Sequence, residues 1–180
     1  MKVVKDILYK VRINAVQGNT EVFINSIQFD SRKIQSDDLF VAQKGLIFDG
    51  HKFIDTSIEL GAKVIVCEEF PTNLVADVTY IKVEDSKEAL AIMAANFYDN
   101  PSSKLKLIGI TGTNGKTTTS NLVKQLWDLN NINSGLIGTL GVEIGIEKID
   151  GVRTTPEADE LQALAALMVE RGNTHLAMEI

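Results

Sequence analysis

The chain has 180 residues, and its 18 Lys and Arg against 24 Asp and Glu give a formal net charge of −6. With 44% hydrophobic and 23% charged residues it has the composition of a globular protein, and its acidic balance argues against a dedicated nucleic-acid-binding protein. It has one cysteine, no apolar signal-peptide core at its start and no stretch of roughly 18 uncharged apolar residues. We therefore expect a cytoplasmic protein without a membrane partner.

The first part of the chain alternates short apolar runs with helical patterns. Strands are expected at residues 22–27, 39–42, 64–67 and 80–83, and a helix is expected at 51–60. A second helix is expected after a cap at Asp85 or Ser86, and it should end at residues 98–103. The continuous apolar run of 64–67 predicts a strand that is covered on both faces. Because Pro101 disfavours helical geometry in the residue before it, we place a domain boundary there. The predicted domains are residues 1–99 and 100–180.

The second part opens with an apolar run at 105–110, which predicts a buried strand. A glycine- and threonine-rich loop and a helix follow, and the leucines of that helix are expected to pack in a core or between domains: Leu122, Leu126 and Leu129. Later strands are expected at 136–139, 142–149 and 175–180, with a helix at 156–171. This alternation predicts an α/β fold with a doubly wound parallel sheet.

The segment between the expected strand and helix reads Gly112-Thr113-Asn114-Gly115-Lys116-Thr117-Thr118. Its glycines allow the backbone to curl so that successive N–H groups point at one anion, and the helix N-terminus adds partial positive charge. Lys116 can bridge the β- and γ-phosphates of a nucleotide, and the Thr117 hydroxyl can ligate Mg²⁺. The strict P-loop pattern would have a glycine at Ile110, so the sequence fails that pattern. It still has the glycines, lysine and threonine by which such a loop would bind phosphate. A glycine-rich turn with a solvated lysine is the alternative reading.

The remaining reactive side chains carry no such pattern. His51 and His175 have no acidic or cysteine neighbours at the spacing of metal ligands, so neither is assigned to catalysis. Cys67 ends an apolar run and is interpreted as a buried residue, not a nucleophile. No guanine-reading Asn-Lys-x-Asp element occurs in the chain, which argues against a GTPase.

Residues 111–119 resemble the ATP loop of the Mur ligase family, whose variant likewise lacks a glycine at the position of Ile110. Further segments agree in order with the same family: Asp30-Ser31-Arg32, residues 39–42, Asp49-Gly50-His51, Thr154-Thr155-Pro156-Glu157 and Ala177-Met178-Glu179-Ile180. Within the family the best match is the MurE type, and it covers essentially the whole chain. Arg153 departs from the asparagine that relatives often carry before the paired threonines.

The resemblance implies a small N-terminal α/β domain that binds UDP-MurNAc, followed by the first part of a P-loop, doubly wound ATPase domain. It implies an ATP- and Mg²⁺-dependent ligase of peptidoglycan biosynthesis, monomeric as a full-length protein. The enzyme would add diaminopimelate, or lysine, to UDP-MurNAc-L-Ala-D-Glu through an acyl phosphate. The family continues beyond Met178-Glu179-Ile180, so the chain is expected to be an N-terminal fragment that is inactive alone.

The resemblance also implies roles for individual residues. Lys116 is the expected catalytic residue, and the expected ATP-binding residues are Gly112, Thr113, Asn114, Gly115, Lys116, Thr117 and Thr118. Expected substrate contacts are Phe29, Ser31, Thr154 and Thr155, with residues 46–48 flanking the same nucleotide. Expected metal ligands are Thr117 and Glu179. Without the resemblance, Asp30-Ser31-Arg32 is equally typical of an Asx turn, Thr155 of a helix cap and Glu179 of a strand-edge carboxylate.

Two other classes of function remain open from the sequence. A P-loop kinase or nucleotidase would release ADP without an amino-acid acceptor. A non-catalytic nucleotide-binding module would act only with a partner chain. Both share the phosphate loop with a ligase, so the loop alone does not distinguish them.

Overall fold

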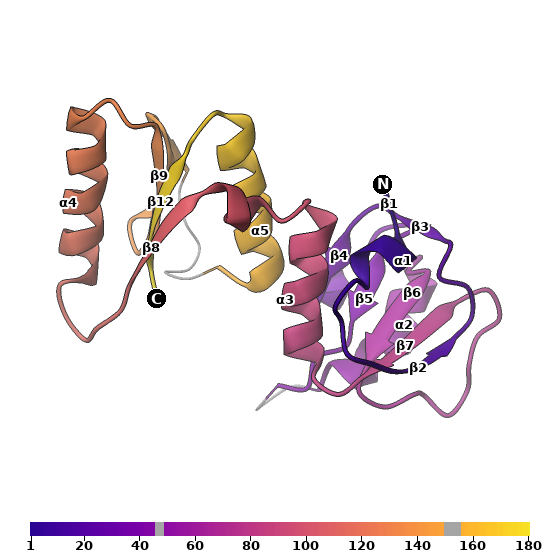
Figure 1. The fold of residues 1–180 in the computed structure, drawn as a ribbon. Helices are drawn as coiled ribbons and strands as arrows, with labels where there is room; N and C mark the ends of the chain where they lie inside the picture. The colour runs from indigo at the N-terminus through magenta and orange to yellow at the C-terminus, as the bar shows by residue number, and fades with distance from the viewer. Residues whose placement is uncertain (46–48, 150–155) are drawn as a thin grey trace. The chain divides into compact units, whose positions relative to one another are not determined.

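A computed structural model describes residues 1–45, 49–149 and 156–180, which divide into two compact units, Met1–Phe97 and Tyr98–Ile180 (Figure 1). The predictions for residues 46–48 and for Arg153, Thr154 and Thr155 lie outside the described residues. Among the residues that are described, no helix is long and apolar enough to span a membrane.

The first unit is built on a five-stranded sheet. In pairing order its strands are β2 (Ile13–Gln17), β7 (Thr79–Val83), β6 (Val64–Cys67), β5 (Leu39–Val41) and β4 (Ile27–Gln28). The last four are parallel and β2 is antiparallel to β7. Every residue of β6 is buried, which confirms the strand that the apolar run predicted. The remaining elements are β1 (Lys2–Val3), α1 (Val4–Ile7), β3 (Phe23–Ile24), η1 (Ser31–Lys33), η2 (Gly50–Phe53), α2 (Ile54–Glu59) and α3 (Ser86–Phe97).

Some of these boundaries differ from the sequence expectations. The single strand expected over 22–27 is two short strands, because β3 pairs with β1 while β4 joins the main sheet. The helix expected over 51–60 begins as the 3-10 turn η2 and continues as α2. Cys67 is buried in the core, and this burial raises the pKa of its thiol to about 11. The thiol is therefore protonated at neutral pH, as expected of a residue without a nucleophilic role.

The second unit contains a mixed five-stranded sheet. Its strands in pairing order are β11 (Glu147–Ile149), β10 (Gly141–Ile144), β9 (Ser134–Gly138), β12 (His175–Glu179) and β8 (Lys106–Ile110). Strands β9, β12 and β8 are parallel, whereas β10 and β11 form an antiparallel hairpin. Gly145, with φ of 61°, lies in the turn that divides the run 142–149 into this hairpin. The α/β class is confirmed, but the sheet that was expected to be parallel is mixed, because β10 turns back against β9 and forms an antiparallel hairpin with β11.

Helices α4 (Lys116–Leu129) and α5 (Ala158–Glu170) and the 3-10 turn η3 (Pro101–Lys104) complete the second unit. The core lies between α5 and the sheet and includes Leu105, Ile137, Val142, Ile144, Ala165, Met168, Leu176 and Met178. Helix α5 begins at Ala158 with Glu157 in the N-cap position. The start expected at Pro156, with Thr155 as the cap, was therefore two residues early.

Burial in the core of this unit was expected of two segments, and in both cases this expectation was wrong. Strand β8 is exposed rather than buried, with Leu107 44% and Ile108 43% exposed, because it pairs only with β12 among the described residues. The leucine stripe of α4 is also exposed: Leu122 54%, Leu126 60% and Leu129 80%. Helix α4 turns Ser120 and Lys124 inward instead.

Lys124 is a buried cation held by its own helix and by the β10–β11 turn. Its Nζ lies 2.9 and 2.8 Å from the two carboxylate oxygens of Asp128 and 3.2 Å from the carbonyl oxygen of Gly145. The Lys124 side chain is only 5% exposed, whereas that of Asp128 is 52% exposed. Removal of Asp128 would therefore leave a buried charge without its partner, whereas removal of Lys124 would leave a carboxylate that water can still solvate.

We expect Asp128→Asn to destabilise the second unit by about 2 kcal/mol, because it leaves a buried ammonium without its carboxylate. Lys124→Met should cost less, since it removes the buried charge and leaves Asp128 half in water. Urea unfolding followed by the fluorescence of Trp127, the only tryptophan, measures both. Equal costs for the two variants would contradict this account of the pair.

Candidate functional site

The glycine-containing loop of residues 111–115, which is predicted to bind phosphate, connects the carboxyl end of β8 to the first residue of α4. Gly112 has φ of 146° and Gly115, the N-cap residue of α4, has φ of 79°, a region that favours glycine. A Cβ atom would meet nothing within 4 Å at Gly115 and no atom closer than 3.7 Å at Gly112. Both glycines are thus required by backbone conformation and not by space, as expected of a loop that turns its N–H groups toward one point.

Lys116 is the first residue of α4, and its side chain folds back over the loop. Its Nζ donates a hydrogen bond to the carbonyl oxygen of Gly112 at 2.7 Å in an exposed setting. This bond holds the ammonium group beside the loop backbone. The structure therefore places the lysine where it can meet an anion bound at the helix N-terminus.

Glu179 ends β12 at the carboxyl edge of the sheet and is 1% exposed. Its Oε2 accepts hydrogen bonds from the hydroxyls of Thr117 at 3.1 Å and Thr139 at 3.0 Å. Its Oε1 accepts from the Ser120 hydroxyl and from the Thr139 N–H, both at 3.3 Å. The two predicted metal ligands, Thr117 and Glu179, are thus in direct contact at the start of α4.

These donors fit a hard cation. A carboxylate and a threonine hydroxyl are oxygen ligands of the kind that Mg²⁺ prefers, and Mg²⁺ usually takes only one or two protein carboxylates together with phosphates and water. Within the described ranges, no group of three or more His, Cys, Asp or Glu side chains could hold a metal by itself. The site therefore suits a magnesium ion that is bound together with a nucleotide.

Gly138, the last residue of β9, leaves the space that the Glu179 carboxylate fills. A Cβ atom at this position would overlap Glu179 Oε1 and lie 2.8 Å from its Cδ. Sequence reasoning missed Gly138, Ser120 and Thr139. The available signal was weak: Thr139 is the last residue of the strand expected at 136–139, and in the structure it directly follows β9 at the carboxyl edge of the sheet.

In the first unit, Phe29 and Ser31 are partly buried and follow the carboxyl end of β4. Asp30 caps η1 by accepting a hydrogen bond from the N–H of Arg32 at 3.1 Å. The Arg32 guanidinium binds the same carboxylate at 2.8 and 2.7 Å and lowers the pKa of Asp30 to about 2. The Asx turn considered from the sequence is therefore present, and it orders the backbone around Ser31.

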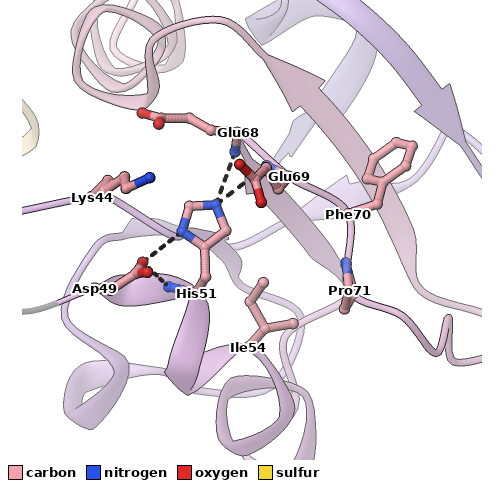
Figure 2. Close-up of a pocket in the computed structure, with 8 residues that line it drawn as sticks. All are labelled: Lys44, Asp49, His51, Ile54, Glu68, Glu69, Phe70 and Pro71. Carbon is pink, nitrogen blue, oxygen red and sulfur yellow. Dashed lines mark hydrogen bonds and ion pairs between the residues drawn. The ribbon is translucent and has the colours of Figure 1, made fainter.

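A small pocket lies at the neighbouring strand ends of the same unit (Figure 2). Its lining residues are Lys44, Asp49, His51, Ile54, Glu68, Glu69, Phe70 and Pro71. Its volume of about 160 Å³ is below the roughly 300–1,000 Å³ of most ligand pockets, so it does not hold a nucleotide by itself. His51 occupies its wall, and both of its ring nitrogens have partners, which the sequence did not indicate.

The chain matches two known domain families. The Mur ligase family, catalytic domain, matches residues 23–98, and the Mur ligase middle domain matches residues 110–180. The chain belongs to the Mur ligase family. The predicted ATP, substrate and metal contacts of this Mur ligase chain remain predictions, and Thr154 and Thr155 lie outside the described residues.

Two similar proteins carry the same specific name. The UDP-N-acetylmuramoyl-L-alanyl-D-glutamate–2,6-diaminopimelate ligases of Cytophaga hutchinsonii and Clostridium tetani are each 47% identical to this Mur ligase chain over 178 residues. Each alignment covers 98% of this chain and 37% of the relative, so the chain spans a little over a third of these proteins.

Solved structures share the fold. A structure of a ligase with the same name has a TM-score of 0.77 at 23% identity, over 100% of this chain and 36% of that chain. MurF ligase of Thermotoga maritima in complex with ADP has a TM-score of 0.54 at 24% identity, over 86% of this chain and 31% of that chain.

Proposed function

We propose that this chain is the N-terminal part of an ATP-dependent, amide-forming ligase of the MurE type. The complete enzyme adds diaminopimelate to UDP-MurNAc-L-Ala-D-Glu during peptidoglycan biosynthesis, in the cytoplasm and as a monomer. The names and identities of the relatives support the substrate. The observation that carries the proposal is the contact between buried Glu179 and Thr117 at the phosphate loop.

In the proposed reaction, the loop of residues 112–118 binds the phosphates of ATP. Lys116 neutralises charge on the transferred γ-phosphoryl group, and the loop N–H groups orient it. Thr117 and Glu179 would hold Mg²⁺, which when bound neutralises charge on the same phosphate. Phosphoryl transfer of this kind depends on position and electrostatics more than on covalent help from the protein.

The γ-phosphoryl group passes to the side-chain carboxylate of the substrate D-Glu, and ADP leaves. The amine of diaminopimelate then attacks the acyl carbon, the new C–N bond forms, and inorganic phosphate leaves with the carboxylate oxygen. In this proposal Phe29 and Ser31 contact the uridine nucleotide in the first unit. Thr154 and Thr155 contact the muramoyl-dipeptide.

The test is the mass of the product formed by the complete protein from ATP and UDP-MurNAc-L-Ala-D-Glu. With diaminopimelate present, the substrate should gain the mass of diaminopimelate less one water. Lysine in its place tests the acceptor. A phosphorylated substrate as the stable product, or ADP formed with no change in the substrate, would support a kinase or nucleotidase and overturn the ligase.

A further inference from the structure

His51 connects two loops of the first unit at the carboxyl edge of its sheet. Its Nδ1 lies 2.7 Å from Oδ1 of Asp49, and its Nε2 lies 3.0 and 3.4 Å from the backbone nitrogens of Glu68 and Glu69 (Figure 2). Asp49 and His51 lie after β5, whereas Glu68 and Glu69 directly follow β6. A single side chain therefore joins the exits of two neighbouring parallel strands.

These partners assign a role to each ring nitrogen. The backbone N–H groups of Glu68 and Glu69 can only donate, so Nε2 is an acceptor. The remaining ring proton is then on Nδ1, which donates it to the Asp49 carboxylate. The same carboxylate oxygen accepts the backbone N–H of His51 at 3.0 Å. These bonds lower the pKa of Asp49, which keeps it an ionised acceptor for the ring.

The turn that carries His51 is itself fixed to the chain leaving β5. The N–H of Gly50 donates to the carbonyl oxygen of Gln43 at 2.8 Å. A Cβ atom at Gly50 would lie 2.7 Å from the nitrogen and 2.8 Å from the oxygen of Gln43, so only glycine allows this approach. Lys44 and Asp49 form an antiparallel bridge beside it. The Asp49-Gly50-His51 segment is therefore a turn that backbone contacts hold in place. The side chain of its last residue, His51, reaches the two residues that follow β6.

The connection extends in two directions. Glu68 accepts hydrogen bonds from the N–H of Ser86 at 3.1 Å and from its hydroxyl at 2.8 Å, which ties the loop after β6 to the start of α3. In the other direction, η2 leads directly into α2, and α2 contacts η1, the turn that contains Ser31. His51 thus lies between the start of α3 and the segment predicted to contact the uridine nucleotide.

We propose that His51 is a positioning residue for the nucleotide end of the UDP-MurNAc substrate, acting through α2 and η1 on Ser31. This inference rests on the proposed function of the first unit. His51 does not itself touch the substrate in this account. It fixes the loop after β5 to the loop after β6, so that the turn bearing Ser31 is preformed before the substrate binds. Preformed sites bind more tightly because less ordering is required on binding.

Two substitutions, called half-isosteres here because each keeps one of the two hydrogen-bonding positions of the imidazole ring, separate the two connections that His51 makes. In His51→Gln the amide oxygen reaches the position of Nε2 and can accept from Glu68 and Glu69, but the link to Asp49 is lost. In His51→Asn the amide nitrogen reaches the position of Nδ1 and keeps the link to Asp49, but the second loop is released. His51→Ala loses both. The Kd of the full chain for UDP-MurNAc-L-Ala-D-Glu is measured by calorimetry for all four proteins, with the Kd for ATP and the thermal midpoint as controls.

The proposal predicts about a tenfold weaker Kd for the uridine substrate in His51→Ala and His51→Asn, the effect of losing one or two hydrogen bonds. His51→Gln should recover binding to within about threefold, and the Kd for ATP should not change. If His51→Ala does not fold, the Gln and Asn variants still carry the test. Equal Kd values in the wild type and both half-isosteres would overturn the proposal, even with lowered thermal midpoints, and so would a Gln variant as weak as the Asn variant. Absence of binding by the wild type would instead overturn the function proposed for the first unit, and this inference with it.

Discussion

Replacing Lys116 with methionine is expected to lower kcat of the complete ligase by about 10²–10³-fold, the usual cost of removing one preorganised group that stabilises transition-state charge. The side chain begins α4, and its Nζ is already held 2.7 Å from the Gly112 carbonyl oxygen beside the loop. Methionine keeps the length of the side chain and its packing but removes the charge. The measurement is phosphate release at saturating ATP, UDP-MurNAc-L-Ala-D-Glu and diaminopimelate.

Lys104→Met is the matched control, because Lys104 is an exposed lysine of the same unit at the end of η3. It should leave kcat unchanged within about twofold, since isolated surface charges contribute little. A Lys116→Met enzyme as fast as the Lys104→Met enzyme would show that the loop does not act on the transferred phosphate.

Gly138→Ala is expected to raise the Mg²⁺ concentration required for activity by about 10–100-fold, the usual effect of disturbing the groups that orient a metal ligand. The φ of Gly138 is outside the left-handed region, so alanine is compatible with the backbone. The added methyl group would overlap Oε1 of Glu179 and force the carboxylate away from the hydroxyls of Thr117 and Thr139. Phosphate release titrated with Mg²⁺ measures the effect.

Leu140→Ala serves as the control, because it changes an exposed side chain two positions further along the same segment. Circular dichroism should show that both variants are folded. If Gly138→Ala needed no more Mg²⁺ than the control, the Glu179 carboxylate would not be part of the metal site.

The part of the site that could be predicted from the sequence is the part that is local in the chain. Strand, glycine loop and helix follow one another around Lys116, so periodicity and glycine chemistry were sufficient. The prediction that Glu179 belongs to this site required the resemblance, because its contact with Thr117 depends on how the strands pair. In the structure β12 lies parallel to β8 with Glu179 opposite Ile110, the last residue before the loop. This register places the carboxylate beside the start of α4.

Burial and long-range partners could not be predicted in the same way. The apolar run of β8 indicates a strand but not whether both of its neighbours are present, and Leu107 and Ile108 are exposed at the sheet edge. His51 had no acidic or cysteine partner at metal-ligand spacing in the sequence. Its partner Glu68 is 17 residues away and is reached only because β5 and β6 pair in parallel.

Whether the complete protein is an amide-forming ligase is tested by its phosphate release with ATP, Mg²⁺ and UDP-MurNAc-L-Ala-D-Glu, measured with and without diaminopimelate. We expect sustained release to require both the uridine substrate and the amino acid, because in the proposed reaction the amine displaces phosphate from the acyl intermediate. Release at the same rate without any amino acid would contradict it.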